Sequence, residues 1–314
     1  PGMIEVVNPA WLSMVVDSGR YGYADIGVPP SPALDRYSYT ALCRLLGYAA
    51  GMPALEVMGH DFSLKASIDV SCAITGAWVT AFVEGVPVAP WRVFRVKAGS
   101  TIRVKEVTEG LRYYIGFSGI IDAAKVAGSY TTNLECRFGG YSGRPFLKGD
   151  RIALKDVRDA GERAIAGSLI PSMKAPHILR IIDGEEERYF SAEALKSLFE
   201  KDGDPWYKVT TKTNRTGIRL EGKPLEFKKG TEQSIISEGI LPGVVQVPGG
   251  GQPIIVLYER TIGGYARIGH VIRADRDLLA HLKPLDMVRF QRVTRGEAEG
   301  LWNEKAEQYY NMLP

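Results

Sequence analysis

Cysteine is scarce in this chain, and the cysteines present are poorly placed for a shared structural role. Cys43, Cys72 and Cys136 are odd in number, lie far apart and never form a C-x-x-C pair. This spacing predicts neither a disulfide framework nor a zinc site. Three reduced thiols fit a cytosolic protein, so we expect a cytoplasmic location.

The sequence also lacks an excess of one charge and a long apolar run. Its 39 Lys and Arg residues nearly balance 36 Asp and Glu residues, and no basic block is long enough to follow a phosphate backbone. We therefore expect no nucleic-acid partner. No apolar run approaches the roughly 20 residues that span a bilayer, and no basic segment followed by an apolar one opens the chain. We expect neither a membrane segment nor a secretion signal.

Standard catalytic signatures are missing as well. Gly249–Gly251 is followed by Gln252 and Pro253, so the chain has no G-x4-G-K-[ST] phosphate loop. Ser142 lies one glycine position short of a G-x-S-x-G elbow, which argues against a serine hydrolase. The histidines are never four positions apart and predict no metal site: His60, His177, His270 and His281.

What the sequence does contain is a glycine-rich stretch, Ser234–Gly269. Two short apolar runs, 243–247 and 253–258, flank Pro248 and three glycines, and the stretch closes near Gly263-Gly264-Tyr265. Such runs predict strands joined by tight turns, and glycine lets a ligand or another chain approach the backbone closely. The alternative is an ordinary glycine-rich hairpin of a barrel, without a further role.

Short strands dominate the first half of the chain. Strand-like segments recur roughly every eight to twelve residues between Met3 and Phe117, with glycines between them, as is typical of a barrel or sandwich. One amphipathic helix is predicted over Pro32–Leu46, with Ser31 as its N-cap. Crossover helices for a parallel sheet are nearly missing, so the predicted fold class is mainly β with a few short helices.

The composition changes near the middle of the chain. Residues 158–176 mix charges, small residues and prolines, and we predict that they link a first domain, 1–157, to a second, 177–314. Thr294 and Glu297 form a capping-box pattern near the end of the second domain. We therefore expect a C-terminal helix that packs on the body of the protein.

Two sequence echoes suggest an internal duplication. The pattern R-x-G-x4-G-x-P occurs at Arg20–Pro29 and again at Arg215–Pro224, and LKGDRIAL at 147–154 is echoed by LKPLDMVRF at 282–290. Two copies of one β-rich unit would explain both echoes. The two arginines would then occupy related turns, where each either fixes a carboxylate or carbonyl group of a ligand or satisfies carbonyl groups of its own turn.

A series of short motifs runs along nearly the whole chain, from Met3 to about Thr294. The motifs are VDSGRYGY at 16–23, GVP at 27–29, ALDR at 33–36, ALE at 54–56, TGA at 75–77, GSYTTNL at 128–134, GGYSGR at 139–144, NRTG at 214–217, SEG at 237–239, PG at 242–243, QVP at 246–248 and GGY at 263–265. In this order and combination the chain resembles the biotin-dependent carboxyltransferase-like family, also called the allophanate hydrolase subunit 2 family.

The resemblance implies two cyclophilin-like β-barrel domains and a role as a subunit. Stand-alone members are similar to the C subunit of the ATP-dependent 5-oxoprolinase. That enzyme opens a small cyclic amide, 5-oxoproline, to glutamate, and its C subunit works with the B subunit, an allophanate hydrolase subunit 1-like protein, and the A subunit. We therefore expect a subunit of an ATP-dependent amide hydrolase, with ATP bound with or by the partner.

Two alternatives stay open under the same resemblance. One is a biotin-dependent carboxyltransferase subunit of the urea or allophanate type, to which biotin would arrive on another protein because Met173-Lys174 lacks the context of a biotinyl-lysine. The other is a non-catalytic regulator that binds a histidine-kinase-inhibitor-like homologue of the B subunit.

Electrostatic positioning would carry the chemistry of such an amide hydrolase. The predicted catalytic residues are Arg215, Gln246, Arg260 and Tyr265. The predicted substrate-binding residues are Asp17, Arg20, Asn214, Gly249, Gly250, Gly251, Gln252, Gly263 and Gly264. The arginines would neutralise carboxylate or phosphoryl oxygens, the glutamines would hydrogen-bond an amide, and backbone N–H groups of the glycine turn would hold an oxyanion.

Several positions depart from the family pattern. Gly250 stands where an acidic residue is usual in the turn after Gln-Val-Pro, Ala266 replaces the proline after Gly-Gly-Tyr, and Asn133 stands where aspartate is common. The run Glu259–Ile262 is one residue shorter than usual. Most of these differences fall in the glycine-rich stretch, so they bear on the activity more than on the fold.

Overall fold

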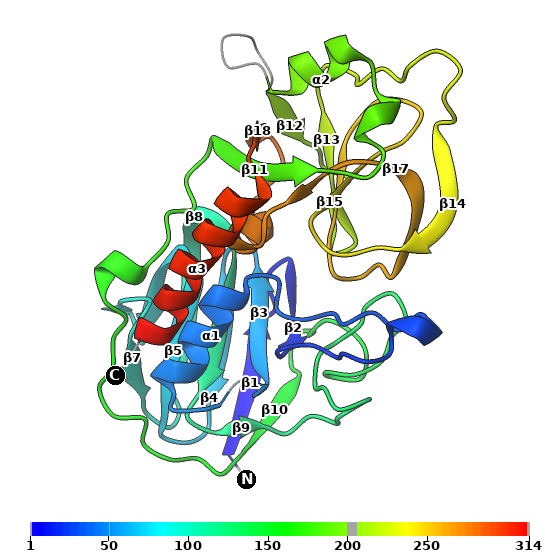
Figure 1. Cartoon of the computed structure of the whole chain (residues 1–314). Coiled ribbons are helices and arrows are strands. Elements are labelled where there is room, and N and C mark those ends of the chain that lie inside the picture. The colour runs from blue at the N-terminus through cyan, green and yellow to red at the C-terminus, as the bar shows by residue number, and fades with distance from the viewer. Residues whose placement is uncertain (1, 50, 200–205, 313–314) are drawn as a thin grey trace. The chain divides into compact units, whose positions relative to one another are not determined.

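The structure, a computed structural model, describes residues 2–49, 51–199 and 206–312 (Figure 1). Its contacts divide the chain into two compact units. Unit 1 comprises the residues up to Arg20, Ser31–Met173 and the residues from Gln308 onward. Unit 2 comprises Tyr21–Pro30 and Lys174–Glu307.

The elements of unit 1 are mostly strands. They are β1 (Gly2–Asn8), β2 (Leu12–Val16), α1 (Arg36–Leu45), β3 (Ala54–Met58), β4 (Phe62–Ala66), β5 (Val70–Val83), β6 (Val86–Val88), β7 (Val93–Val96), β8 (Thr101–Phe117), β9 (Ile120–Ile121), β10 (Arg151–Lys155) and the 3₁₀ helix η2 (Gly167–Leu169).

Unit 2 mixes short strands with short helices. Its elements are η1 (Ala24–Ile26), β11 (His177–Asp183), η3 (Glu187–Tyr189), α2 (Ala192–Phe199), β12 (Tyr207–Val209), β13 (Gly217–Glu221), β14 (Ser234–Gly239), β15 (Val244–Val247), β16 (Ile254–Val256), β17 (Ile262–Val271), η4 (Arg273–His281), β18 (Met287–Arg292) and most of α3 (Arg295–Asn311).

The sheet of unit 1 is a half-barrel built around two long strands, β5 and β8. They pair antiparallel over positions 72–83 and 102–117, with bulges that let the strands bend. The two halves of β8 also pair with β3 and β4, and the main path runs β2-β3-β8-β4-β1-β10-β9. Side chains such as Val57, Leu64 and Ile115 form one hydrophobic core on this sheet.

Helix α1 covers a second apolar core of unit 1. Asp35 is its N-cap, because the Asp35 carboxylate accepts a hydrogen bond of 2.9 Å from the Ser38 backbone N–H. The prediction of Ser31 as the cap is wrong, and the predicted helix start was four residues too early. The Ser31 hydroxyl instead accepts a hydrogen bond from Asn133 Nδ2 at 3.0 Å, which ties it to a distant loop.

Most of the segment predicted as a linker belongs to unit 1. Residues 158–173 fall inside this unit, and Ala160, Ile165 and Met173 are buried in the same core as α1. The Ile165 backbone N–H also donates to the Trp91 carbonyl at 2.9 Å. A few isolated apolar residues therefore hold a segment whose sequence shows no sustained apolar face.

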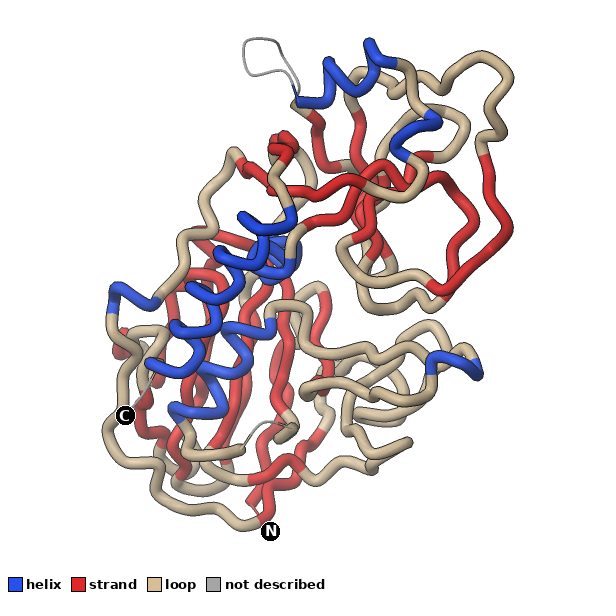
Figure 2. The backbone as a smooth tube through the Cα atoms, in the orientation of Figure 1, coloured by secondary structure: helices blue, strands red, loops and turns tan. Residues whose placement is uncertain are grey.

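Unit 2 contains a closed barrel (Figure 2). Among the residues that the structure describes, seven strands follow the order β11-β18-β12-β13-β16-β15-β17, and β17 pairs back to β11. β11 and β18 pair in parallel, whereas β14 lies outside the ring and pairs with β17. The prediction of a mainly β chain with few helices is confirmed, although the first of the two expected barrels is a half-barrel.

One of the two sequence echoes has a structural counterpart. The turn before β10 is closed by Asp150, whose carboxylate accepts a hydrogen bond from the Leu147 N–H at 2.7 Å. The turn before β18 is closed in the same way by Asp286, which accepts from the Lys283 N–H at 3.1 Å. The two units thus enter comparable strands through the same type of aspartate turn.

The other echo is not a structural repeat. Arg20–Pro29 forms an irregular loop with η1, whereas Arg215–Pro224 contains strand β13. The expectation that the two arginines occupy related turns is therefore wrong. Four matched positions that include two glycines do not determine a local conformation, because glycine is compatible with both loops and strand ends.

Helix α3 begins at the predicted capping box. Glu297 Oε2 accepts the Thr294 N–H at 2.7 Å, and Thr294 Oγ1 accepts the Glu297 N–H at 3.2 Å, which confirms this prediction. Within unit 2 the guanidinium of Arg273 stacks on the Trp302 ring at 3.8 Å from its centre. No helix in the described parts of the chain has both the length and the apolar character needed to cross a membrane.

Candidate functional site

Several of the predicted site residues gather along one segment of unit 2, residues 259–265. The segment follows β16 and includes the first residues of β17, which pair antiparallel with the last residues of β14. Backbone pairing therefore fixes its conformation on one side. Arg215 and Gln246 contact the segment from neighbouring elements. We call 259–265 together with these two side chains the candidate site.

Arg215 holds the first residue of the segment. Its Nε lies 3.1 Å from Glu259 Oε1, and the two residues are only 6% and 8% exposed. Asn214 shapes the adjoining turn, because its Oδ1 accepts hydrogen bonds from the N–H groups of Thr216 and Gly217 at 2.9 and 3.2 Å. A buried ion pair on a well-formed turn thus sets where the segment begins.

Gln246 holds the other end of the segment from β15. Its Nε2 donates to the carbonyl of Tyr265 at 3.4 Å. A Cβ at Gly263 would lie 2.5 Å from Gln246 Nε2 and 2.8 Å from Ile240 Cδ1, so a side chain at this position would displace the amide. A Cβ at Gly264 would lie 2.9 Å from a neighbouring serine hydroxyl. A side chain at either glycine would therefore force its neighbours to shift.

Three side chains of the candidate site are open to solvent. Ile262 is apolar and 60% exposed, whereas the other two are polar: Arg260 is exposed, and Tyr265 is 45% exposed. Gln246 and Arg215 are buried beneath the same segment. A small molecule that reached this surface would meet a guanidinium and a phenol hydroxyl, while the two buried side chains would hold those groups in place.

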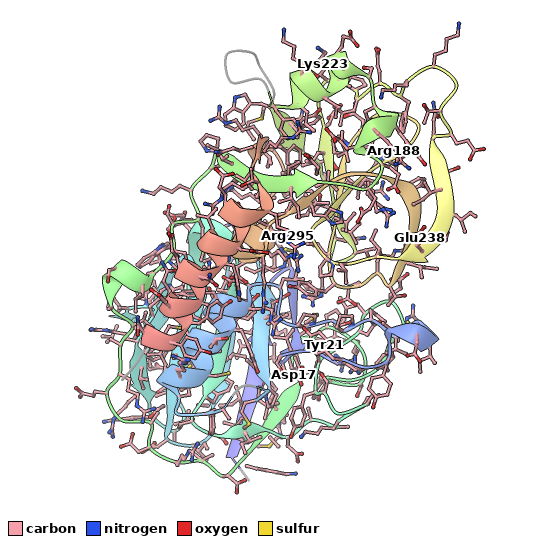
Figure 3. All side chains as sticks on the ribbon, viewed as in Figure 1. Asp17, Tyr21, Arg188, Lys223, Glu238 and Arg295 are labelled. Carbon is pink, nitrogen blue, oxygen red and sulfur yellow. The ribbon has the colours of Figure 1, made fainter. Side chains whose placement is uncertain are left out.

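A charge network lies beside the candidate site on β17. The guanidinium of Arg267 binds both carboxylate oxygens of Glu186, at 2.6 and 2.8 Å, and reaches Glu238 of β14 at 3.3 Å. Figure 3 labels Glu238 on β14. Hydrogen bonding from Arg267 lowers the pKa of Glu186 below its usual range. The network ties η3, β17 and β14 together and neutralises part of the acidic charge near the segment.

The glycine turn lies at the other end of β16 from Glu259. Gln252 uses both of its amide atoms there, because Oε1 accepts the Gly222 N–H at 2.9 Å and Nε2 donates to the Gly222 carbonyl at 3.0 Å. The Gly251 carbonyl accepts the Leu225 N–H at 2.9 Å. The glycines of the predicted substrate-binding group 249–252 thus lie apart from the candidate site, and they line a hollow of about 400 Å³.

Asp17 and Arg20 belong to unit 1, and both are buried (Figure 3 labels Asp17). The Asp17 carboxylate accepts hydrogen bonds from the Ser129 hydroxyl and the Tyr130 N–H, both at 2.6 Å. Arg20 Nη2 donates to the Thr131 carbonyl at 2.9 Å. Both side chains therefore bind the loop at residues 129–131. This indicates that they position that loop and do not contact a ligand.

Three residues that line the hollow of the glycine turn were not predicted from the sequence: Lys228, Lys229 and Thr231. The available signal was two consecutive lysines before a glycine in a turn-rich segment. The pairing of Glu259 with Arg215 was not predicted either. Among the residues that the structure describes, no group of three or more His, Cys, Asp or Glu side chains is arranged to hold a metal ion.

Comparisons with known proteins cover both units. A family model described as carboxyltransferase domain, subdomain A and B, matches residues 26–292, which include the whole candidate site. The chain is 32% identical to the 5-oxoprolinase C subunit of Escherichia coli over 94% of this chain and 93% of that protein. It is 30% identical to the 5-oxoprolinase C subunit of Haemophilus influenzae over 99% and 97% of the two chains.

A solved structure gives the same picture of the fold. The urea amidolyase of K. lactis matches 99% of this chain with a TM-score of 0.90 and 25% identity. The match covers 20% of that chain, so the present chain spans about a fifth of the amidolyase. The mainly β architecture described above is therefore shared with a known urea amidolyase.

Proposed function

This chain belongs to the carboxyltransferase domain family, subdomain A and B, and on that premise we propose that it is the C subunit of a heteromeric, ATP-dependent 5-oxoprolinase. The observation that carries the proposal is the end-to-end match with two bacterial 5-oxoprolinase C subunits, which leaves no large part of either protein unmatched. The urea amidolyase of Saccharomyces cerevisiae is 29% identical, but the match spans only 16% of its length. The higher identity to the two oxoprolinase subunits, 32% and 30%, supports the oxoprolinase role.

The reaction opens a lactam. Water adds across the ring C–N bond of 5-oxoproline to give glutamate, and hydrolysis of ATP to ADP and phosphate drives the step. The substrate carries one carboxylate and one ring amide, so its recognition requires a cation and a hydrogen-bonding group near each other. The exposed guanidinium of Arg260 and the hydroxyl of Tyr265 supply these two groups on one segment.

Arg215 and Gln246 act in this proposal by holding the segment. Arg215 is paired with buried Glu259, and Gln246 is bound to the carbonyl of Tyr265. Their burial supports a positioning role beneath the residues that would contact substrate. Asn214, Gly263 and Gly264 contribute in the same way, by giving the turn and the strand start their conformation.

The proposed function includes partner proteins. The matched bacterial proteins are named as subunits, so we propose that the chain works with homologues of the A and B subunits, and that ATP is bound with or by the partner. Three free cysteines, one of them exposed, are typical of a reducing compartment and support a cytoplasmic location.

The proposal is tested by reconstituting the complex of this chain with homologues of the A and B subunits. The chain is co-expressed with homologues of the A and B subunits, and 5-oxoproline-dependent formation of ADP and glutamate is measured. We expect turnover only when all three proteins are present. Arg260→Ala should lower kcat/KM for 5-oxoproline by about 10- to 100-fold, the effect of losing a charge-assisted hydrogen bond.

Arg219→Ala is the matched control, because Arg219 is an exposed arginine on β13, outside the candidate site. Its kcat/KM should stay within about twofold of the unmodified complex. A stable complex of all three proteins without 5-oxoproline-dependent turnover would overturn the proposal. Carboxyl transfer from carboxybiotin by that complex would identify the carboxyltransferase alternative, and binding without either activity would identify the regulatory one.

A further inference from the structure

Unit 2 has a hollow of about 400 Å³ that the proposed function does not use. It lies between two turns: the loop 224–231, which carries Lys228, Lys229 and Thr231, and the glycine turn 249–251. Its volume is in the range of small-molecule sites. The lining is dominated by polar groups and main chain, which suits a strongly polar ligand.

The lysine-bearing loop is anchored to the body of unit 2. The Phe227 ring packs against Phe190 with ring centres 4.5 Å apart. The Lys228 N–H donates to the carbonyl of Tyr189 at 2.8 Å, and the Thr231 N–H donates to the carbonyl of Lys228 at 3.1 Å. The two ammonium groups therefore extend from a fixed backbone, which reduces the entropy lost when they close on a ligand.

The opposite wall exposes main chain. Gly251 has φ +73°, and its N–H closes the turn onto the Pro248 carbonyl at 2.8 Å. An added Cβ at Gly250 would meet no atom within 4 Å, so this position borders open space. A ligand can therefore approach the backbone of this wall more closely than a wall covered by side chains would allow.

The charges of the hollow favour an anion. Lys228 and Lys229 are both exposed, and within the described parts of the chain neither ammonium group forms an ion pair. Glu226 is the acidic residue of the lining, so the lining carries one net positive charge. Two ammonium groups, one hydroxyl and exposed main chain match the several acceptor oxygens of a phosphoryl group better than a single carboxylate.

We propose that this hollow binds the phosphoryl group of a nucleotide or of a phosphorylated small molecule. The site differs from a phosphate loop of the Walker type, because its lysines come from a separate turn that faces the glycines. The proposal does not depend on the substrate of the complex, since binding is measured on this chain alone.

A second hollow provides an internal contrast. It has a volume of about 440 Å³ and is lined by Glu186, Glu232 and Glu238, whereas Thr231 borders both hollows. Its carboxylates repel a phosphoryl group, although Arg267 neutralises part of their charge. Anion binding should therefore depend on Lys228 and Lys229 in the first hollow. It should not change when a carboxylate of the second hollow, such as that of Glu238, is removed.

The test is a calorimetric titration of the purified full chain with pyrophosphate, ATP and acetyl phosphate at low ionic strength. Lys228→Ala/Lys229→Ala should raise Kd about tenfold, the loss of roughly one charge-assisted contact. Gly250→Asp should weaken binding to a similar extent, because it places a carboxylate in the open space. Added salt should also weaken binding, since the cations are exposed.

Matched controls separate charge from shape and stability. Lys223→Ala and Glu238→Gln should each leave Kd within about twofold. Gly250→Asn adds a side chain of similar size to aspartate but no charge, so it should weaken binding less than Gly250→Asp does. Tighter binding of ATP and pyrophosphate would identify a nucleotide site, and tighter binding of acetyl phosphate would identify an acyl-phosphate site. The proposal is overturned if the unmodified chain binds none of the three ligands, or if the double lysine variant and Gly250→Asp both bind as tightly as the unmodified chain.

Discussion

The predicted site residues of the two units differ in their exposure to solvent. In unit 1, Asp17, Arg20 and Glu56 are at most 2% exposed and bind other groups of the protein. In unit 2, Arg260 and Tyr265 are open to solvent on a segment that buried Arg215 and Gln246 hold. Sequence motifs were present in both units, but burial separates residues that build the protein from residues that remain available to a ligand.

In unit 1 both carboxylate oxygens of buried Glu56 interact with other groups of the protein. Glu56 Oε2 accepts hydrogen bonds from the Leu34 N–H at 3.1 Å and the Tyr114 hydroxyl at 3.0 Å, and Oε1 lies 3.6 Å from Arg112 Nε. The Tyr114 hydroxyl accepts in turn from the Asp35 N–H at 2.9 Å. Burial raises the pKa of Tyr114 well above its usual range, so the phenol stays neutral and can donate to the carboxylate.

The largest effect is expected from breaking this network. Glu56→Ala should lower the free energy of unfolding by about 3–5 kcal/mol, because it leaves the buried guanidinium of Arg112 without its carboxylate. Urea unfolding monitored by fluorescence measures the loss. Glu106→Ala is the control, since Glu106 is an exposed residue of β8 and its removal should change stability by less than about 0.5 kcal/mol. A loss below about 1 kcal/mol for Glu56→Ala would show that the network is not structural.

The buried ion pair of unit 2 should give the next largest effect. Arg215→Ala should cost about 2–3 kcal/mol, because Glu259 then stays buried without its charge-assisted hydrogen bond. Arg215→Met/Glu259→Leu should recover much of this stability, because it removes both charges and keeps apolar volume. The free energies of unfolding of the two variants and of the unmodified protein are measured by urea unfolding.

The double variant also separates positioning from direct contact with substrate. If Arg215 only positions the segment, the reconstituted complex with Arg215→Met/Glu259→Leu should keep more activity than the complex with Arg215→Ala. Equal loss of activity in both variants, despite the recovered stability, would assign a direct catalytic role to the Arg215 guanidinium.

Sequence alone predicted the local features of both units and missed the distant ones. Strand density, the glycine turn and the capping box at Thr294 depend on neighbouring residues, and each could be predicted from spacing. Two partners of Asp17, Ser129 and Tyr130, lie 112 and 113 positions away in sequence, and periodicity carries no information about such contacts. The cap of α1 was placed at Ser31 and not at Asp35, because nothing in the local sequence shows that Ser31 is bonded to Asn133.

The charge network of β17 predicts a pH dependence for unit 2. Hydrogen bonding from Arg267 lowers the pKa of Glu186 in the folded state, so the pair stabilises the fold above the unfolded pKa of about 4.3. That stability is lost as the pH falls through the lower folded pKa. Glu186→Gln should cost about 1 kcal/mol at about pH 7 and progressively less as the pH falls through the lowered folded pKa of Glu186, because the protonated carboxyl group no longer forms an ion pair with Arg267. Thermal melting of both proteins between about pH 7 and pH 3 measures the difference.

The melting temperatures of the two proteins should therefore converge on acidification. Glu185→Gln is a useful comparison, because Glu185 lies 3.5 Å from Arg267 but is much more exposed than Glu186. It should produce a smaller difference at neutral pH. A constant gap between Glu186→Gln and the unmodified protein at all pH values would contradict the proposed origin of the effect.

The smallest effect is expected at Gly250. Gly250→Ala should change stability by less than about 0.5 kcal/mol, because the added Cβ meets no atom within 4 Å and φ is not in the left-handed region. Gly251→Ala, one residue on, should cost more than about 1 kcal/mol, because φ is +73° and the Cβ would lie 2.9 Å from the Leu225 nitrogen. Thermal melting compares the two variants.

Gly139 of unit 1 can be compared with Gly250 and Gly251 in the same way. A Cβ at Gly139 would lie 2.2 Å from the Thr131 carbonyl oxygen, so Gly139→Ala should destabilise the protein as Gly251→Ala does. Gly250 would then be a glycine that the fold does not need. If Gly250→Ala keeps full stability but weakens pyrophosphate binding, the glycine serves the ligand. If Gly250→Ala changes neither, the charge of the lysine loop alone accounts for any phosphoryl binding in this hollow.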